Sequence, residues 1–240
     1  MKLSVIMPVY NEVRYIDEII NKVLTSDIGN IEKEIIIIES NSTDGTRELV
    51  KKYENRTEFK IFYEEKPAGK GHAVKNGLKL ATGDIFLIQD ADLEYNPDEY
   101  PLLLKPIIEG RAKFVLGSRH LGNAGWAYRK FSYGSPTAFV YNIGTRVFDF
   151  FFNHLYGVRL TDPMTMFKVF CRECLNDIEF QSDYFDLDLE IVAKFIKKGY
   201  IPVEVPVSYV SRSFSEGKKV VFYKVAIKVF IVVIKVRFKD

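Results

Sequence analysis

The sequence contains few cysteines, scattered histidines and no long apolar run. Its two cysteines, Cys171 and Cys174, are too few for the disulfide framework of a small secreted protein, and no second ligand pair accompanies them to indicate a zinc site. No apolar segment approaches the roughly 20 residues that a membrane-spanning helix requires. The first residues, MKLSVIMPVYNE, predict a strand rather than a signal peptide. We therefore expect a cytoplasmic protein with reduced thiols.

The chain also has little net charge, but that charge is unevenly distributed. Its 34 basic and 32 acidic residues give a net charge of +2. Residues 217–240 hold seven basic residues and one acidic residue, which gives this segment +6 and leaves −4 for the rest of the chain. We therefore expect no nucleic-acid-binding face on the body, and attraction to anionic surfaces only from the C-terminal segment.

Short apolar runs alternate with segments of helical periodicity over the first half of the chain. The strand-like runs are residues 3–9, 34–40, 59–63, 84–90 and 113–118, and the helical segments are residues 15–24, 44–53, 71–81 and 98–109. This alternation predicts an α/β fold, a mostly parallel sheet with helices on both faces. With 240 residues, 47% of them hydrophobic, one main domain is expected.

Polar residues follow the first, second and fourth of these runs, where a sheet of this kind binds its ligands. Asn11 and Asp44 are explained equally well as turn and helix-capping residues. Asp90 and Asp92 are more informative, because two carboxylates one residue apart repel unless a cation or strong donors compensate them. Mg²⁺ and Mn²⁺ prefer such oxygen ligands and complete their shell with phosphates, so a nucleotide diphosphate is the natural partner. Glu94 could supply a further oxygen.

Motifs along most of the chain make this interpretation specific. Residues 8–12 (PVYNE), 42–46 (STDGT), 69–73 (GKGHA) and 90–95 (DADLEY) resemble the motifs of family 2 glycosyltransferases, which have a nucleotide-sugar-binding, Rossmann-like GT-A fold. Within that family, residues 117–119, 161–168 and 205–219 are similar to the dolichol-phosphate mannose synthase branch. One departure is Glu39-Ser40, where the family usually has two aspartates, which leaves the donor preference open.

The resemblance implies roles for particular residues. Those implied to hold the nucleotide sugar are Pro8, Tyr10, Glu12, Glu39, Lys70, Asp90 and Ala91. Those implied to hold a divalent metal, Mg²⁺ or Mn²⁺, are Asp90, Asp92 and Glu94. Those implied to orient an acceptor phosphate are Arg119, Arg129, Ser132, Arg212 and Lys218, since arginine binds phosphate oxygens bidentately. The catalytic set would be Asp92, Arg119, Asp162 and Arg212.

Each implied cation has a plainer interpretation as a solvated surface charge. For Lys70 a glycine turn with an exposed lysine is equally good, and its spacing does not satisfy the P-loop pattern.

The reaction that follows is inverting transfer of a hexose from a nucleotide-diphosphate sugar to a polyprenyl or dolichyl phosphate. GDP-mannose is the favoured donor, ahead of UDP-glucose. A phosphate acceptor is already anionic and needs orientation more than deprotonation. The alternative is a glycan hydroxyl acceptor, for which Asp162 would be the general base. A catalytically silent nucleotide-binding module is a third possibility.

Two segments indicate contact with a membrane. Residues 137–156 have helical spacing and are aromatic on almost every side from Val147 onward, which is typical of a helix in the core or in lipid. At the C-terminus Lys224, Lys228, Lys235 and Lys239 fall within a stripe of about 60° on an otherwise apolar helix. Such a basic amphipathic helix is expected to lie at the cytoplasmic face of a membrane. Packing in the core, a homo-oligomer contact or a membrane partner protein are the alternatives.

These patterns predict a division of the chain. Residues 1–217 would form the GT-A catalytic domain, with a donor-binding half over residues 1–118 and an acceptor half over residues 119–217. Residues 218–240 would form the C-terminal interface helix.

Overall fold

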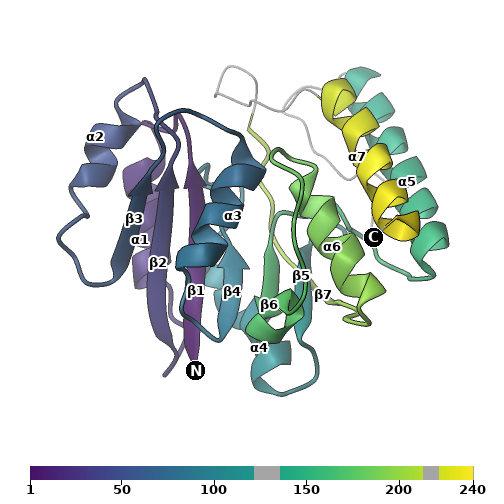
Figure 1. Ribbon diagram of the computed structural model, residues 1–240, viewed down its shortest axis with the longest axis horizontal. Helices are drawn as coiled ribbons and strands as arrows, with labels where there is room; N and C mark the ends of the chain where they lie inside the picture. Colours follow the sequence, from purple (N-terminus) through teal and green to yellow (C-terminus); the bar gives the residue numbers. More distant parts are fainter. Residues whose placement is uncertain (122–135, 213–221, 240) are drawn as a thin grey trace.

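A single mixed sheet organises the protein. The computed structural model describes residues 1–121, 136–212 and 222–239, with side chains from residue 143 in the second range and from residue 227 in the third. Within these ranges seven strands pair in the order β3-β2-β1-β4-β6-β5-β7 (Figure 1). The strands are β1 (Lys2–Val9), β2 (Glu32–Glu39), β3 (Phe59–Tyr63), β4 (Ile85–Ile88), β5 (Phe114–Ser118), β6 (Lys168–Cys171) and β7 (Val203–Pro206).

Strand direction confirms the mostly parallel sheet. β6 runs antiparallel to its neighbours β4 and β5, and the other neighbouring pairs are parallel. All five strands expected from the apolar runs are present. β6 and β7 were not predicted as strands, because each has only four residues, too few for a clear periodicity.

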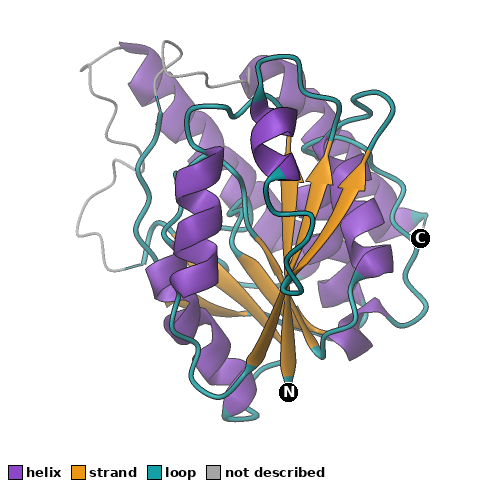
Figure 2. Cartoon of the chain, turned by 90° about the vertical axis from the view of Figure 1, so that its left-hand side faces the viewer, coloured by secondary structure: helices purple, strands orange, loops and turns teal. Residues whose placement is uncertain are grey.

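Helices cover both faces of the twisted sheet (Figure 2). On one face lie α1 (Ile16–Thr25), α2 (Thr46–Lys51) and α4 (Tyr100–Ile108), and on the other α3 (Lys70–Leu80), α5 (Pro136–Tyr156), α6 (Leu187–Lys197) and α7 (Phe222–Phe238). Two short 3-10 helices are η1 (Pro97–Glu99) and η2 (Arg172–Leu175). Val5 and Ile6 of β1 are both fully buried, one in each of the two resulting cores. The apolar strands are continuous because both of their faces are covered.

α5 and α7 pack side by side at one end of the molecule (Figure 1). The ring centroid of Phe230 on α7 lies 5.1 Å from the ring centroid of Phe148 and 5.1 Å from that of Phe151, both on α5. One side of each helix joins the core, with Phe152 and Val233 fully buried. Core packing thus accounts for one face of both segments that sequence patterns assigned to a membrane. Among the described helices, none has the combination of length and apolar character that crossing a membrane requires.

Candidate active site

The carboxyl ends of β1 and β4 lie next to each other, because these two strands are parallel neighbours. The chain leaves β1 through Asn11, whose φ of 51° is in the left-handed region that asparagine tolerates. Glu12 is then held in place from both sides. Its N–H donates to Thr46 Oγ1 at 2.8 Å, and its carbonyl accepts from the N–H of Ile16 at 2.9 Å, where α1 begins.

Three carboxylates from these strand ends converge on one arginine. Arg212 Nη1 lies 2.8 Å from Glu12 Oε2, and Arg212 Nη2 lies 2.9 Å from Asp92 Oδ2. Arg212 Nε lies 3.7 Å from Glu94 Oε1, and the guanidinium stands over the ring of Tyr15 at 5.3 Å. Counting only the described side chains, one arginine faces three carboxylates, so this group, which we call the Arg212 cluster, holds more negative than positive charge.

The neighbouring negative charges affect the pKa of Asp92. Burial, together with the charges of Asp90 and Glu94, raises the pKa of Asp92 to about 7, and Arg212 offsets this only in part. A divalent cation would relieve the repulsion, so the oxygen ligands present fit the predicted metal. Among the described residues no group of three or more acidic, histidine or cysteine side chains is arranged to hold a metal ion alone. Diphosphate oxygens and water would therefore have to complete the shell.

Glu94 also connects the segment that follows β4 to the segment that follows β7. Its Oε2 accepts from the hydroxyl of Tyr209 at 2.7 Å, and its Oε1 accepts from the backbone N–H of Arg212 at 3.0 Å. Its carbonyl accepts from the N–H of Val210, also at 3.0 Å. Glu94 thus positions Arg212, a role that the sequence did not indicate.

Lys70 is a paired residue, not a solvated one. Its Nζ lies 2.6 Å from Asp90 Oδ1 and 3.8 Å from Asp188 Oδ2, with only 11% of the side chain exposed. Its Nζ also donates to Met166 Sδ at 3.3 Å. Burial alone would lower the pKa of Lys70, but Asp188 and Asp90 raise it above the ordinary value. Ala91 lies between the two aspartates and packs in the core under α1 and α4.

The residues expected to hold the base and ribose differ in exposure. Glu39 is fully buried at the end of β2. Its Oε1 accepts from the N–H of Ser42 at 2.7 Å and its Oε2 lies 3.3 Å from Arg47 Nε. Pro8 is half-buried, and Tyr10 is 37% exposed. Glu39 therefore shapes the loop after β2, and Arg47, which the sequence motifs did not single out, is its partner.

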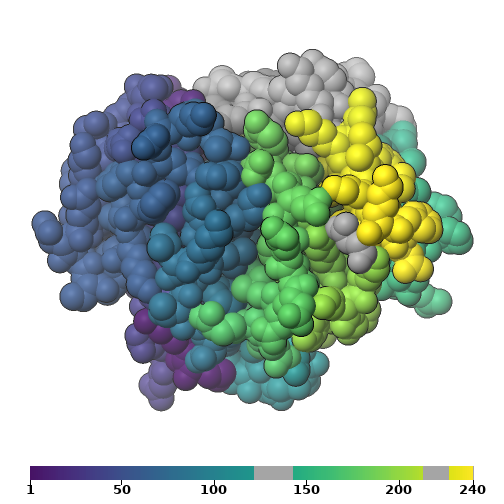
Figure 3. Space-filling view, viewed as in Figure 1, coloured from purple at the N-terminus to yellow at the C-terminus, as the bar shows by residue number. Residues whose placement is uncertain are grey.

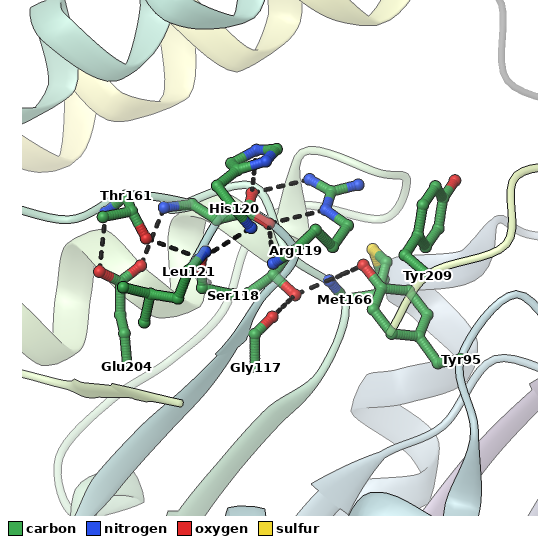
Figure 4. A network of polar contacts seen from close by, with 12 residues as sticks. Tyr95, Gly117, Ser118, Arg119, His120, Leu121, Thr161, Met166, Glu204 and Tyr209 are labelled. Atoms are coloured by element: carbon green, nitrogen blue, oxygen red, sulfur yellow. Dashed lines mark hydrogen bonds and ion pairs between the residues drawn. The ribbon is translucent and has the colours of Figure 1, made fainter. Parts of the chain in front are cut away.

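On the acceptor side, Arg119 and Asp162 form a buried bidentate pair (Figure 4). Arg119 Nε and Nη2 each donate to the carboxylate of Asp162 at 2.7 Å, and the backbone N–H of Arg119 donates to it at 3.1 Å. His120 Nε2 lies 3.6 Å from the same carboxylate, and the guanidinium stands over Tyr209 at 5.1 Å. Burial would raise the pKa of Asp162, but Arg119 holds it below its ordinary value.

Glu204 supports this pair from β7. Its two carboxylate oxygens accept from the backbone N–H groups of Thr161 and Asp162, at 2.7 and 2.8 Å. Figure 4 shows these contacts beside the hydrogen bond of 2.7 Å between the hydroxyls of Thr161 and Ser118. No sequence motif marked Glu204, because nothing in the chain pattern indicates which backbone groups a strand carboxylate will meet.

Asp149 of α5 is a second residue that sequence motifs did not mark. It is 6% exposed, and neither carboxyl oxygen has a hydrogen-bond partner among the residues that the structure describes. Burial, then the nearby charge of Asp162, raises the pKa of Asp149 to about 8, although Arg119 acts in the opposite direction. Arg129, Ser132 and Lys218, the other residues implied in acceptor-phosphate binding, lie outside the described residues.

Comparison with known proteins identifies the family. The model of the family described as "Glycosyl transferase family 2" matches residues 4–178. The chain belongs to this family. The sheet order, and the acidic side chains at the joined ends of β1 and β4, are consistent with the GT-A fold that the motifs implied.

Two curated members of the family align with most of this glycosyltransferase chain. It is 28% identical over 222 residues to the dolichol-phosphate mannosyltransferase of Pyrococcus furiosus, covering 91% of this chain and 59% of the relative. It is 25% identical over 211 residues to glycosyltransferase AglJ of Haloferax volcanii, covering 88% of this chain and 63% of that relative. The chain therefore spans about three fifths of the length of these relatives.

Solved structures share the fold of this family 2 protein at low sequence identity. Glucosyl-3-phosphoglycerate synthase from Mycobacterium tuberculosis, in complex with Mn²⁺, UDP and phosphoglyceric acid, superimposes with a TM-score of 0.73 and 18% identity. The alignment covers 100% of this chain and 79% of that one. The same synthase with Mg²⁺ and UDP gives a TM-score of 0.71, also at 18% identity, covering 98% of this chain and 79% of that one.

Proposed function

We propose that this protein transfers a hexose from a nucleotide-diphosphate sugar to a polyprenyl phosphate, with inversion at the anomeric carbon. The observation that carries the proposal is the Arg212 cluster, where surplus negative charge lies at the joined ends of two parallel strands. A metal-bound diphosphate would balance that charge. The mannosyltransferase of P. furiosus, as a relative over most of the chain, supports a polyprenyl phosphate acceptor and GDP-mannose as the favoured donor.

Donor binding is assigned to the side chains at the strand ends. Asp92 would be the first metal ligand, with Asp90 and Glu94 beside it. When bound, Mg²⁺ or Mn²⁺ supplies Lewis-acid stabilisation of the charge that develops on the departing diphosphate. Lys70 holds Asp90 in place at 2.6 Å. The UDP complexes of the mycobacterial synthase, which shares the fold, support a nucleotide at this edge and keep UDP-glucose as the second candidate donor.

The environment of Asp162 favours an anionic acceptor over a hydroxyl. A general base for a hydroxyl must be able to accept a proton near neutral pH. Asp162 is fully buried, accepts three hydrogen bonds from Arg119 and has a pKa below its ordinary value. It is therefore a poor base. A phosphate acceptor needs no deprotonation, only cations that orient it, and Arg212 at the edge of the cluster is the described residue best placed for that task.

Radiolabelled GDP-mannose and UDP-glucose, each incubated with the protein, Mn²⁺ and a polyprenyl phosphate, test the proposal. We expect label to move into an organic-extractable product with one of the two donors. A water-soluble labelled glycan, formed when an oligosaccharide replaces the lipid, would instead support the hydroxyl-acceptor function. Nucleotide binding without any turnover would support a silent binding module.

We also propose that α5 and α7 dock the protein on an anionic membrane, where its lipid acceptor would reside. The apolar side chains exposed on these helices are Ile143, Val147, Phe150, Ile227, Ile231, Ile234 and Phe238. Phe150 and Phe238 are the most exposed, at 75% and 73%. α7 forms part of the molecular surface in Figure 3, and the lysines at positions 228, 235 and 239 add positive charge beside the apolar groups. Apolar burial and attraction to anionic lipid would act together.

Vesicle sedimentation tests this docking surface. Ile231→Ser and Phe150→Ser remove exposed apolar side chains without disturbing the core, so we expect weaker binding to vesicles that contain an anionic lipid. Leu102→Ser is the matched control, because Leu102 is 51% exposed on α4, on the opposite face of the sheet. Equal sedimentation of all three variants and the parent protein would contradict the proposal.

A further inference from the structure

A row of alternating charges runs from the donor site into the interior of the protein. Asp90 lies 2.6 Å from Lys70, Lys70 lies 3.8 Å from Asp188, and Asp188 lies 3.7 Å from Lys168. The inner pair is shielded from water, since Lys168 is fully buried and Asp188 is only 6% exposed. The row therefore connects a carboxylate of the donor site to an ammonium group in the core.

The backbone fixes both ends of this row. Lys168 begins β6, and its Nζ donates to the carbonyl of Thr165. α3, which begins at Lys70, packs closely against the segment that leads into α6, which carries Asp188. A Cβ at Gly71 would lie 2.7 Å from the backbone carbon of Asp183, and no substituent fits there. Lys70 and Asp188 are therefore held at a set separation.

A fully buried lysine has a desolvation cost that an apolar side chain of similar length would not have. We therefore infer that Lys168, at the start of β6, is present for its charge and not for its packing. We propose that Lys168 and Asp188 are positioning residues for the donor site, which set how much of the positive charge of Lys70 is available to Asp90. The inference rests on the proposed function, in which Asp90 faces the metal-bound nucleotide.

The distances in the row explain how Lys168 and Asp188 would affect the contact between Lys70 and Asp90. Asp188 stands between two ammonium groups at nearly equal distances, while Lys70 makes its one short contact with Asp90. Without Lys168, the unbalanced charge of Asp188 would draw Lys70 inward and leave Asp90 more negative. Without Asp188, Lys70 would give its whole charge to Asp90. The two losses must therefore change the affinity for a divalent cation in opposite directions.

A second ion pair on the same helix provides a matched control. Lys75 Nζ of α3 lies 2.6 Å from Asp183 Oδ1, which is the same separation as in the Lys70–Asp90 pair. The Lys75–Asp183 pair is more exposed, at 21% and 46% of the two side chains, and it does not contact Asp90. Lys75→Met removes one positive charge from the same helix and leaves the four residues of the row in place.

The test measures Mn²⁺ binding by electron paramagnetic resonance in the presence of GDP or UDP, without turnover. We expect Lys168→Met to tighten Mn²⁺ binding and Asp188→Asn to weaken it, each by about tenfold. The double variant should bind Mn²⁺ as weakly as Asp188→Asn, to within about twofold, because Lys168 acts on Lys70 through Asp188. Lys75→Met should leave the affinity unchanged. In a Lys70→Met background, the two substitutions should lose their effect, because they act through Lys70.

Changes of the same sign in both single variants, or no change, would overturn the inference, because a purely structural role would weaken binding in both. If Lys168→Met does not fold, the loss in Asp188→Asn and its disappearance in the Lys70→Met background decide the question. Failure of the parent protein to bind Mn²⁺ with either nucleotide would refute the proposed function itself, and this inference with it. The parent measurement thus separates the two failures.

Discussion

Two arginine sites of this protein have opposite effects on the pKa of their carboxylates: Arg119 lies in a buried site and Arg212 in a half-buried one. At the joined ends of β1 and β4, Arg212 faces three carboxylates, and the pKa of Asp92 is raised to about 7. At the end of β5, Asp162 is the carboxylate that the described part of the chain pairs with Arg119, and the pKa of Asp162 is lowered. Burial alone would raise the pKa of Asp162 more, because the Asp162 side chain is fully buried and that of Asp92 is 15% exposed, so the nearby charges decide the outcome. A balanced pair stabilises the fold, and an unbalanced cluster is suited to take up a cation.

The largest effect should come from breaking the balanced pair. Asp162→Asn leaves the buried guanidinium of Arg119 without its counter-charge, so we expect the free energy of unfolding to fall by about 3–5 kcal/mol. Denaturant titration measures the change. Asp92→Asn is the control, because it removes repulsion from an overcrowded cluster and should leave the unfolding free energy unchanged or higher. Equal destabilisation by both substitutions would remove the distinction between the two sites.

Asp92→Asn should instead act on the reaction. It removes the first proposed metal ligand but no core packing, so we expect transfer to fall by at least about 100-fold while the circular dichroism spectrum stays the same. Initial rates with and without a chelator measure this loss. Activity that is insensitive to both the substitution and the chelator would take the metal out of the proposed mechanism.

Asp149 allows a smaller test of surplus charge on the acceptor side. Its pKa is about 8 in the folded protein, against an ordinary value of 3.8. Because the folded-state pKa is raised, its contribution to stability is fully present below about pH 4 and is lost as the pH rises through about 8. Asp149→Asn should therefore raise the unfolding free energy by about 1–3 kcal/mol at pH 8 and have little effect at pH 4. Titrations at the two pH values that give equal differences would contradict this assignment.

The smallest effect should come from Glu204. Glu204→Gln replaces one of two acceptor oxygens with an amide that cannot accept from Thr161 or Asp162. We expect about 1 kcal/mol of lost stability. The donor KM should not change, because Glu204 supports only the balanced pair. A raised donor KM would show that the support reaches the Arg212 cluster.

The same comparison explains which features of the fold and of the candidate site could be predicted from the sequence alone. In residues 1–118 the strands are encoded locally: each predicted apolar run formed a strand, and the polar residues that follow β1 and β4 meet at one edge of the sheet. Asp90, Asp92 and Glu12 were accessible to prediction for that reason. The cation that each carboxylate contacts could not be predicted, because Lys168 and Asp188 lie about 100 residues or more after Lys70 in the chain.

In the acceptor half, motif residues were recognised but their partners were not. Arg119 was expected to orient an acceptor phosphate and Asp162 to belong to the catalytic set, and the structure shows that the two residues are also ion-pair partners. Glu204 and Asp149 carry no motif, so only the packing of β7 and α5 reveals their surroundings. The sequence indicates that a buried charged residue must have a partner. Whether that partner is a ligand or another side chain depends on long-range contacts that the sequence pattern does not reveal.

The position of β6 also has a consequence for synthesis. β4 and β5 are not paired with each other, and β6, made some 50 residues after β5 ends, fills the space between them. While the ribosome translates the intervening residues, the nascent chain carries two strands with open edges, to which a foreign strand could add. The seven-stranded sheet therefore stays divided until β6 is available, and we expect chaperone demand to peak before residue 171 leaves the exit tunnel.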